Sequence, residues 1–316
     1  MSKIYDICID LGGTKIKIAL VSNGMVFTSE VIDAISANGL KERLHVIQDI
    51  VDAMLEKQQI PLSTIGAVCI SVPGIVDPTA KRVLSIDKKF ADAPQIDFLA
   101  WADACWHLPL FMDNDARCAM IGEWKHGAAK GYLDAAIMTL GTGIGSSAIM
   151  DGKIIRGKHF MAGILGGHST IDLYGDRCNC GNIGCGETVI ATWNIAEKIT
   201  QHIEYQNSKL FQTIKLDFES VFKLASSDPL AQIMLEKALH TWGACAVNLI
   251  HAYDPEILVL SGGIMQSADV VIPAIQSYIN KHAWTPWGTV QVVPAMHINE
   301  AAFLGAAELN KMNLST

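Results

Sequence analysis

Residues 4–22, with the sequence IYDICIDLGGTKIKIALVS, decide the fold of this 316-residue chain. The apolar run over 4–10 predicts a buried strand, and the alternation of apolar and polar residues over 15–22 predicts a second one. The glycine-rich turn Asp10-Leu-Gly-Gly-Thr14 joins the two. Asn23-Gly24 then predicts a type I′ hairpin that leads into a third strand over 25–32. The chain is therefore expected to open with three antiparallel strands.

The second half of the chain repeats this plan. A strand expected over 135–140 leads into Gly141-Thr142-Gly143, and a strand over 146–150 follows, ending at the hairpin turn Asp151-Gly152. A strand over 256–260 ends at Ser261-Gly262-Gly263. The other expected elements are helices over 40–55, 98–106, 115–127, 270–282 and 300–309, strands over 65–72, 108–112, 153–155 and 290–293, and a mainly helical stretch over 188–253. Two α/β halves with this pattern predict a duplicated domain with a cleft between the halves.

The composition excludes several classes of protein. Half of the residues are hydrophobic and only 18% are charged, which predicts a large core and argues against disorder. The net charge is −8 and no long Lys/Arg cluster occurs, so nucleic acid is not expected as the partner. Asp6 and Asp10 interrupt the first apolar run, which resembles neither a signal peptide nor a membrane span. We therefore expect a cytoplasmic protein that does not bind a membrane.

The eight cysteines fall into two groups. Five are scattered through apolar segments and are expected to be buried free thiols, namely Cys8, Cys69, Cys105, Cys118 and Cys245. The other three, Cys178, Cys180 and Cys185, follow His168 closely. Three thiolates and one imidazole make a closed tetrahedral zinc site of the structural kind. Glu187, just after the last of these cysteines, would be fixed in place by the metal.

The glycine-rich turns are candidate phosphate sites. Glycine lets the backbone approach a phosphate closely, and successive N–H groups form an anion nest. Thr14 adds a hydroxyl donor, and Asp10 could hold Mg²⁺ through water. Either turn alone has the simpler interpretation of an ordinary hairpin turn, but two of them together predict a grip on one polyphosphate. Gly262-Gly263 provides a third close approach, suited to a nucleoside, and the spacing fits neither a Walker A loop nor a dinucleotide fingerprint.

The motif Asp113-Asn114-Asp115 is expected to end a strand and open a helix. One interpretation is structural, because Asn or Asp at this place caps a helix N-terminus. The other is catalytic, because phosphoryl transfer needs a group that accepts the proton of the attacking hydroxyl. The motif by itself leaves both interpretations open.

These motifs together resemble the ROK family (repressors, open reading frames, kinases). The resemblance covers nearly the whole chain and rests on six motifs in the family's order: Asp10-Leu-Gly-Gly-Thr14, Val72-Pro-Gly-Ile-Val-Asp77, Asn114-Asp115-Ala116, Gly141-Thr142-Gly143, the box of His168, Cys178, Cys180 and Cys185, and Ser261-Gly262-Gly263. It implies an α/β fold, the two-domain actin-like ATPase (ribonuclease H-like) fold with a central cleft and a structural zinc loop. The expected domains are 1–115, completed by the C-terminal segment 300–316, and 116–299, which contains the zinc loop 168–187.

The resemblance also implies a function, that of an ATP- and Mg²⁺-dependent sugar kinase with structural Zn²⁺, acting as a homodimer. Asp115 would take the proton from the sugar 6-hydroxyl, and Asn114 would bind a neighbouring hydroxyl. His168 would lie beside the sugar, and Glu187 would bind hydroxyls near the anomeric carbon. Gly74 would complete the sugar site. The ATP-binding residues would be Asp10, Gly12, Gly13, Thr14, Lys15, Gly141, Thr142, Gly143, Gly262 and Gly263.

The chain departs from the family pattern in two places. The family usually has Ala-Gly-Glu-x-Gly-His before the cysteines, and Leu165 stands at the Glu position here. An Asn-Leu pair with a nearby Trp is also usual, whereas residues 85–90 read Ser-Ile-Asp-Lys-Lys-Phe. The loss of these polar groups predicts a substrate less polar, or differently substituted, near carbons 1 and 2 than glucose. An N-acylated sugar, a glycoside, a deoxy sugar or a cyclitol would fit, and an ordinary hexose stays open as the alternative.

Two other functions compete with the kinase. The first is a catalytically weak, sugar-sensing regulatory member of the same family, which Leu165 would suit. The second is a DNA-binding repressor. Only nine residues precede Asp10, too few for a helix-turn-helix module, so the repressor is expected least.

Overall fold

The computed structural model describes residues 4–312, and this part of the chain divides into two compact units. Unit 1 comprises the chain up to Gly131, the segment Arg156–Ala162, and the chain from Asn299 onward. Unit 2 comprises Tyr132–Ile155 and Gly163–Ile298, and so contains the expected zinc loop. The outermost residues of the expected first domain, 1–3 and 313–316, lie outside the described residues.

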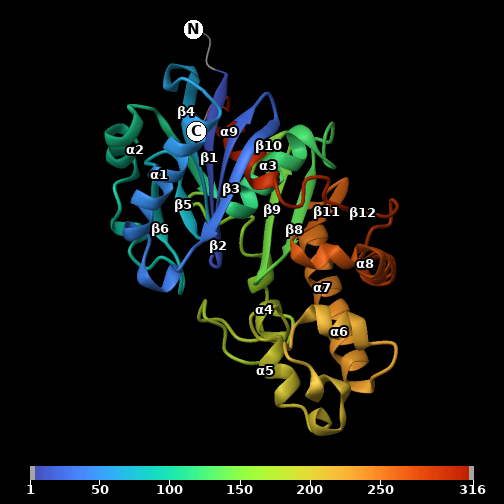
Figure 1. Ribbon diagram of the computed structural model, residues 1–316. Coiled ribbons are helices and arrows are strands. Elements are labelled where there is room, and N and C mark those ends of the chain that lie inside the picture. Colours follow the sequence, from blue (N-terminus) through green and yellow to red (C-terminus); the bar gives the residue numbers. More distant parts are fainter. Residues whose placement is uncertain (1–3, 313–316) are drawn as a thin grey trace. The chain divides into compact units, whose positions relative to one another are not determined.

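Unit 1 is built on a five-stranded sheet with the order β3-β2-β1-β4-β7 (Figure 1). Its strands are β1 (Tyr5–Leu11), β2 (Lys15–Ser22), β3 (Met25–Asp33), β4 (Ile65–Val72) and β7 (Leu110–Asn114). The first three pair antiparallel as predicted, and β1, β4 and β7 pair parallel. Asn23 and Gly24 have φ of 49° and 74°, as a type I′ turn requires. The sequence did not predict the small hairpin of β5 (Ile75–Asp77) and β6 (Arg82–Ser85).

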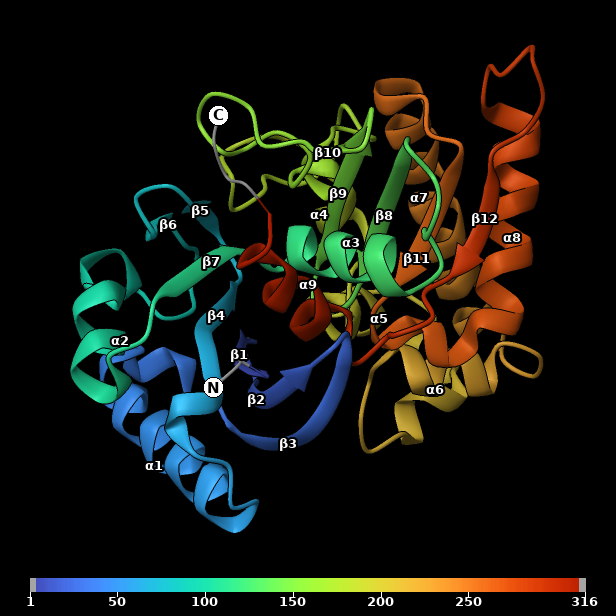
Figure 2. The same ribbon diagram turned by 90° about the horizontal axis from the view of Figure 1, so that it is seen from above.

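Helices cover both faces of this sheet. Figure 2 shows α1 (Lys41–Lys57) and α2 (Phe98–Trp106) on one side and α3 (Asp115–His126) and α9 (Ala301–Leu309) on the other. The apolar face of α1, with Leu44, Ile47 and Val51, is buried in the core of unit 1. This three-layer arrangement buries the parallel strands on both faces, as their continuous apolar sequences require.

The predicted domain boundary after Asp115 is wrong, because α3 packs along α9 within unit 1. Glycines bring the two helices close together. A Cβ atom on Gly122 would collide with the carbonyl oxygen of Ala301, and one on Gly305 would collide with that of Cys118. The chain therefore leaves unit 1 only at Gly131.

Unit 2 has the same plan, with a sheet in the order β10-β9-β8-β11-β12. Its strands are β8 (Ala135–Leu140), β9 (Ile144–Met150), β10 (Lys153–Ile154), β11 (Ile257–Ser261) and β12 (Gln291–Pro294). Its helices are α4 (Gly186–Val189), α5 (Ile195–Thr200), α6 (Phe218–Leu224), α7 (Pro229–Tyr253) and α8 (Ala268–His282). The hairpin, the glycine turn and the parallel strands recur in the same order as in unit 1. The two units thus share the strand order that the sequence predicts for two halves of one plan.

The cysteine predictions hold with one exception. All eight thiols are free, and four of the five scattered ones are buried. Cys105 is only half-buried, because it lies on α2, which covers the outside of the sheet.

Every helix within residues 4–312 is too short or too polar to span a membrane.

Candidate functional site

The parallel strands of unit 1 bring a group of polar side chains to their carboxyl ends. In the sheet register, Asp10 of β1 lies opposite Ser71 of β4, and Ser71 lies opposite Asp113 of β7. The Ser71 hydroxyl donates a hydrogen bond of 2.8 Å to Oδ1 of Asp10. Asn114 and Asp115 follow at the end of β7, so the expected magnesium and base residues of unit 1 share one edge of the sheet.

Asn114 has a structural role that the sequence left open. It is the N-cap of α3, and its Oδ1 accepts hydrogen bonds from the N–H groups of Ala116 (3.0 Å) and Arg117 (3.2 Å). Its Nδ2 donates to the carbonyl oxygen of Gly74 and to Oδ1 of Asp115, both at 2.9 Å. The amide is thus fully hydrogen-bonded inside the protein. For Asn114 to bind a sugar hydroxyl, one of these bonds must be exchanged.

Asp115 has the properties of a general base. Its Oδ1 accepts hydrogen bonds from Asn114 and from the N–H of Ala116, whereas its Oδ2 has no partner among residues 4–312. Burial, together with the negative charge of Asp10, raises the pKa of Asp115 to about 6, although Lys89 and the hydrogen bonds oppose this rise. A carboxylate with this pKa is mostly ionised at neutral pH and still basic enough to accept a proton.

Asp113, the neighbour of these two residues in the motif, is structural. Its side chain is fully buried and forms ion pairs with Arg117 (3.2 Å) and Arg156 (2.9 Å). Arg117 also donates to the carbonyl oxygens of Phe160 (2.8 Å) and Ala162 (3.0 Å). This network holds the segment Arg156–Ala162 in unit 1. Sequence reasoning missed it, and the local signal is the spacing of four residues between Asp113, at the end of β7, and Arg117, in the first turn of α3.

The first glycine turn connects β1 to β2. A Cβ atom on Gly12 would lie 2.6 Å from the carbonyl oxygen of Lys15, so this tight turn requires glycine. A Cβ atom on Gly13 would meet the side chain of Lys89, 2.5 Å from Cε. Thr14 is exposed, and Lys15 Nζ forms a surface ion pair of 2.6 Å with Asp33. Lys15, expected to bind ATP, is thus paired with the neighbouring strand.

The second glycine turn connects β8 to β9 at the equivalent place in unit 2. The N–H of Gly141 donates to the carbonyl oxygen of Gly143 at 3.1 Å, which closes the turn. Oε1 of Glu187 accepts the N–H of Ile144 at 2.7 Å, and a Cβ atom on Gly143 would collide with the Glu187 carboxylate. Glu187, expected to bind sugar hydroxyls, therefore also holds this turn.

The third glycine turn lies against the second. Gly262 has a φ of 94°, and a Cβ atom there would collide with the carbonyl group of Leu140. Strand pairing explains the contact, because Ser261 lies opposite Thr139 in the parallel register of β11 and β8. Around Gly263 there is open space, since no atom lies within 4 Å of a Cβ atom built on it. Unit 2 thus brings two of the three expected ATP turns together.

The predicted metal residues meet in one cluster. The ligand atoms of His168, Cys178, Cys180 and Cys185 all lie within 4.8 Å of one another. Sγ of Cys180 lies 3.7 Å from Sγ of Cys185, and Sγ of Cys178 lies 3.4 Å from Nδ1 of His168. Two thiolates on a tetrahedral zinc ion lie about 3.8 Å apart, because each Zn–S bond is about 2.3 Å long. The donor set and these two separations therefore fit a tetrahedral zinc site.

Leu165 lies just before His168, a candidate zinc ligand. It precedes the short 3₁₀ turn Gly166–His168, and its side chain is 38% exposed. The turn is fixed by Ser146, whose hydroxyl accepts the N–H of Gly166 at 2.8 Å and donates to the carbonyl oxygen of Gly163. An apolar group is therefore held in a defined, accessible position where the ROK pattern has a carboxylate.

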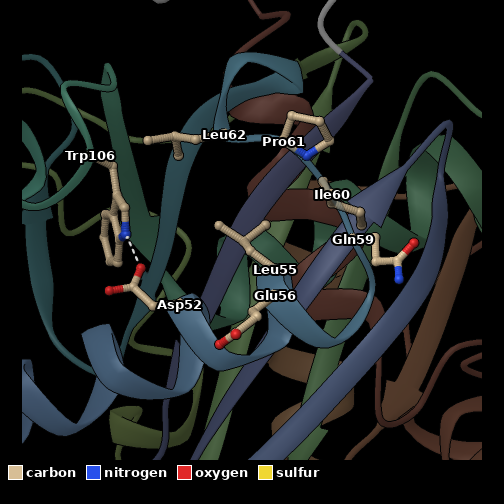
Figure 3. A pocket seen from close by; sticks show the side chains of 8 residues that line it. All are labelled: Asp52, Leu55, Glu56, Gln59, Ile60, Pro61, Leu62 and Trp106. Carbon is tan, nitrogen blue, oxygen red and sulfur yellow. Dashed lines mark hydrogen bonds between the residues drawn. The ribbon is translucent and has the colours of Figure 1, made fainter.

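A pocket of about 380 Å³ lies elsewhere in unit 1, at the C-terminal end of α1 (Figure 3). It is lined mainly by apolar side chains, and none of the predicted site residues belongs to it. Asp52 in its wall accepts a hydrogen bond of 2.8 Å from the Trp106 indole (Figure 3). None of the glycine turns lies in this pocket, and the Asp52 carboxylate is hydrogen-bonded to Trp106, so we do not assign the chemistry to it.

Comparison with families, single proteins and solved structures gives four results. The model of the ROK family matches residues 6–313. A glucokinase of Thermotoga maritima is 26% identical over 98% of both chains. An N-acetylglucosamine repressor of Escherichia coli O157:H7 is 24% identical over 84% of this chain and 65% of its own length. Among solved structures, a ROK family glucokinase from Streptomyces griseus in complex with glucose and AMPPNP has a TM-score of 0.78, with 24% identity over 96% of this chain and 98% of that chain.

Proposed function

The chain belongs to the ROK family, and on that premise we propose that it is an ATP-dependent sugar kinase, which transfers the γ-phosphoryl group to the 6-hydroxyl of a hexose or hexose derivative. The observation that carries the proposal is the Asp115 carboxylate, which has one oxygen without a partner among the described residues and a pKa raised to about 6. Its place beside Asp10 and the first glycine turn suits a base that works next to a phosphate. The glucokinase of Thermotoga maritima, similar over 98% of this chain, supports the proposal of a sugar kinase.

In this reaction Asp115 accepts the proton of the sugar hydroxyl while the hydroxyl oxygen forms a bond to the γ-phosphorus. The bond from that phosphorus to the bridging oxygen breaks, and ADP leaves with the electron pair. Asn114 keeps the carboxylate oriented through its hydrogen bond to Oδ1. Oδ2 is then the oxygen that receives the proton.

Each glycine turn is proposed as a nucleotide-binding segment, since its backbone N–H groups can bind phosphate oxygens. Mg²⁺, when bound, neutralises charge on the phosphates. Asp10 fits a water-mediated magnesium ligand, because only one of its carboxylate oxygens is hydrogen-bonded among the described residues. Zinc would stabilise the loop that carries Glu187 and would take no part in the chemical step.

For the sugar itself, we propose a derivative with an apolar or acylated substituent near carbons 1 and 2. Leu165 supports this, because an exposed leucine cannot bond a hydroxyl there as a carboxylate would. A site that hydrogen-bonds a hydroxyl can reject analogues without that hydroxyl by about 10⁴-fold. Loss of the carboxylate should therefore change the preference among sugars strongly. Glucose as the best substrate by kcat/KM would contradict this part of the proposal.

The experiment is a kinase screen that measures ADP release with hexoses, N-acyl hexosamines, deoxy sugars and inositols, followed by identification of the phosphorylated position. We expect one class of sugar to raise ADP release well above the sugar-free rate. A protein that binds a sugar in a thermal-shift assay yet releases no ADP with any sugar would contradict the kinase. That result would favour the second candidate, a sugar-sensing regulator, for which the similar repressor of Escherichia coli O157:H7 is the supporting observation.

A further inference from the structure

The side chain of Lys89 lies directly on the first glycine turn. A Cβ atom built on Gly13 would be 2.5 Å from Cε, 2.6 Å from Cδ and 3.0 Å from Nζ of Lys89. The end of this side chain therefore occupies the space that glycine leaves open. The ammonium group is brought to the backbone of the turn that is expected to approach a phosphate.

The backbone of Lys89 is fixed by its neighbours. Phe90 is fully buried in the core of unit 1, and its N–H donates to the carbonyl oxygen of Ser36 at 2.9 Å. The hydroxyl of the same Ser36 donates to the carbonyl oxygen of Gly13 at 2.7 Å. Ser36 thus connects the glycine turn to the chain that carries the lysine. These bonds fix the backbone next to Lys89 beside the glycine turn.

The charges around Lys89 leave a place for an anion. No carboxylate within residues 4–312 forms an ion pair with its ammonium group. Its field nevertheless reaches Asp115, whose pKa it lowers against the effects of burial and of Asp10. Lys89 therefore lies near both the phosphate turn and the base, and the phosphoryl group must pass between these two during transfer.

We propose that Nζ of Lys89 binds the phosphoryl group as it is transferred from ATP to the sugar. An ammonium group that lies on the glycine turn and forms no ion pair with a carboxylate of residues 4–312 is suited to the charge on the phosphoryl oxygens. This proposal rests on the proposed kinase function and adds to it a residue that the sequence did not point to. Lys89 would neutralise charge on the phosphoryl group, while the hydroxyl proton goes to Asp115.

The test compares Lys89→Met with Lys88→Met, which removes the same charge from the neighbouring exposed residue. We expect Lys89→Met to lower kcat about 100-fold, the size of effect seen when one donor to a transition-state charge is removed. Lys88→Met should stay within about twofold of wild type. Lys89→Arg, which keeps the charge, should recover part of the loss. Thermal unfolding of each variant shows whether the fold is retained.

The pH profile provides a readout that a purely structural lysine would not move. The charged groups that act on Asp115 are Asp10 and Lys89, and Lys17 acts on Asp10. Removing the ammonium of Lys89 should raise the pKa of Asp115, so the acid limb of kcat/KM should move to higher pH. The same limb should not move in Lys88→Met.

The outcomes separate this inference from the function on which it rests. If wild type phosphorylates a sugar and Lys89→Met matches Lys88→Met in both kcat and acid limb, the assignment of Lys89 is overturned and the kinase stands. If wild type phosphorylates no sugar, the kinase is overturned and the assignment with it. A folded Lys89→Met variant with a loss in kcat and a shifted limb supports the proposal.

Discussion

The two glycine turns at 10–15 and 140–145 occupy the same place in their sheets, yet side chains of opposite charge lie on them. Lys89 lies on Gly13 in unit 1, and Glu187 lies against Gly143 in unit 2. The contacts differ as well, because Glu187 accepts the N–H of Ile144, whereas the Lys89 ammonium has no carboxylate partner among the described residues. The two turns thus join equivalent strands but differ in the charge of the side chain that lies on them. The first turn is left to attract an anion, and the second has already given one N–H to a carboxylate.

The largest expected effect comes from a substitution in unit 1, beside the first turn. Asp115→Asn removes the proton acceptor beside the first turn while preserving the shape of the side chain. We expect turnover to fall by about 10²–10⁴-fold, the usual contribution of a general base. Binding of an ATP analogue and the thermal unfolding temperature should stay close to wild type, because Asn114, not Asp115, caps α3 through side-chain acceptance of two N–H groups. Activity above a tenth of wild type would refute the assignment of the base.

The second prediction concerns unit 2, where the proposed zinc ion is removed. Chelation or Cys180→Ser should lower the unfolding temperature and weaken both sugar and nucleotide binding, because Glu187 connects the metal loop to the second turn. Cys105→Ser, a half-buried thiol on α2, is the matched control and should respond to chelation as wild type does. If nucleotide affinity survives metal removal, Glu187 holds the turn without help from the metal.

The third prediction compares the turns directly through Gly13→Ala and Gly143→Ala. In Gly143→Ala the new methyl group displaces the Glu187 carboxylate and leaves the N–H of Ile144 without its acceptor, which costs about 1–3 kcal/mol. Gly13→Ala displaces only the flexible end of Lys89, so its free energy of unfolding should change by less.

Gly141→Ala is the control for both, because no atom lies within 4 Å of its new methyl group. Denaturant unfolding measures all three variants. Equal destabilisation by Gly13→Ala and Gly143→Ala would show that Lys89 and Glu187 contribute equally to the stability of their turns.

Local sequence explains which parts of this comparison could be predicted. The turns at Gly12-Gly13 and Gly141–Gly143 follow from short-range patterns, and so do the hairpins at Asn23-Gly24 and Asp151-Gly152. The cluster of His168 and the three cysteines also follows, because the spacing of the cysteines within one loop limits the arrangements that they can adopt.

Long-range contacts explain what could not be predicted. Lys89 reaches Gly13 only because Phe90 and Ser36 bring two distant segments together. The boundary at Gly131 depends in the same way on the packing of α3 against α9, which no local pattern encodes. The Asp113-Asn114-Asp115 motif shows that local sequence does not determine the role of each residue. Its three residues are adjacent in sequence, yet one is an ion-pair partner, one a helix cap and one a candidate base.

The smallest expected effect is a change in the pH dependence of kcat/KM, which reports the charges near the first turn. Asp115 must be ionised to accept a proton, so kcat/KM should fall as the pH drops below about 6. Asp10 raises this pKa and Lys89 lowers it. Asp10→Asn should therefore move the acid limb to lower pH, in the direction opposite to Lys89→Met, even if it also weakens magnesium binding. Glu187→Gln, in unit 2, is the control, since the causes of the Asp115 pKa shift do not include Glu187. A limb that moved equally in all three variants would mean that the acid limb does not report Asp115.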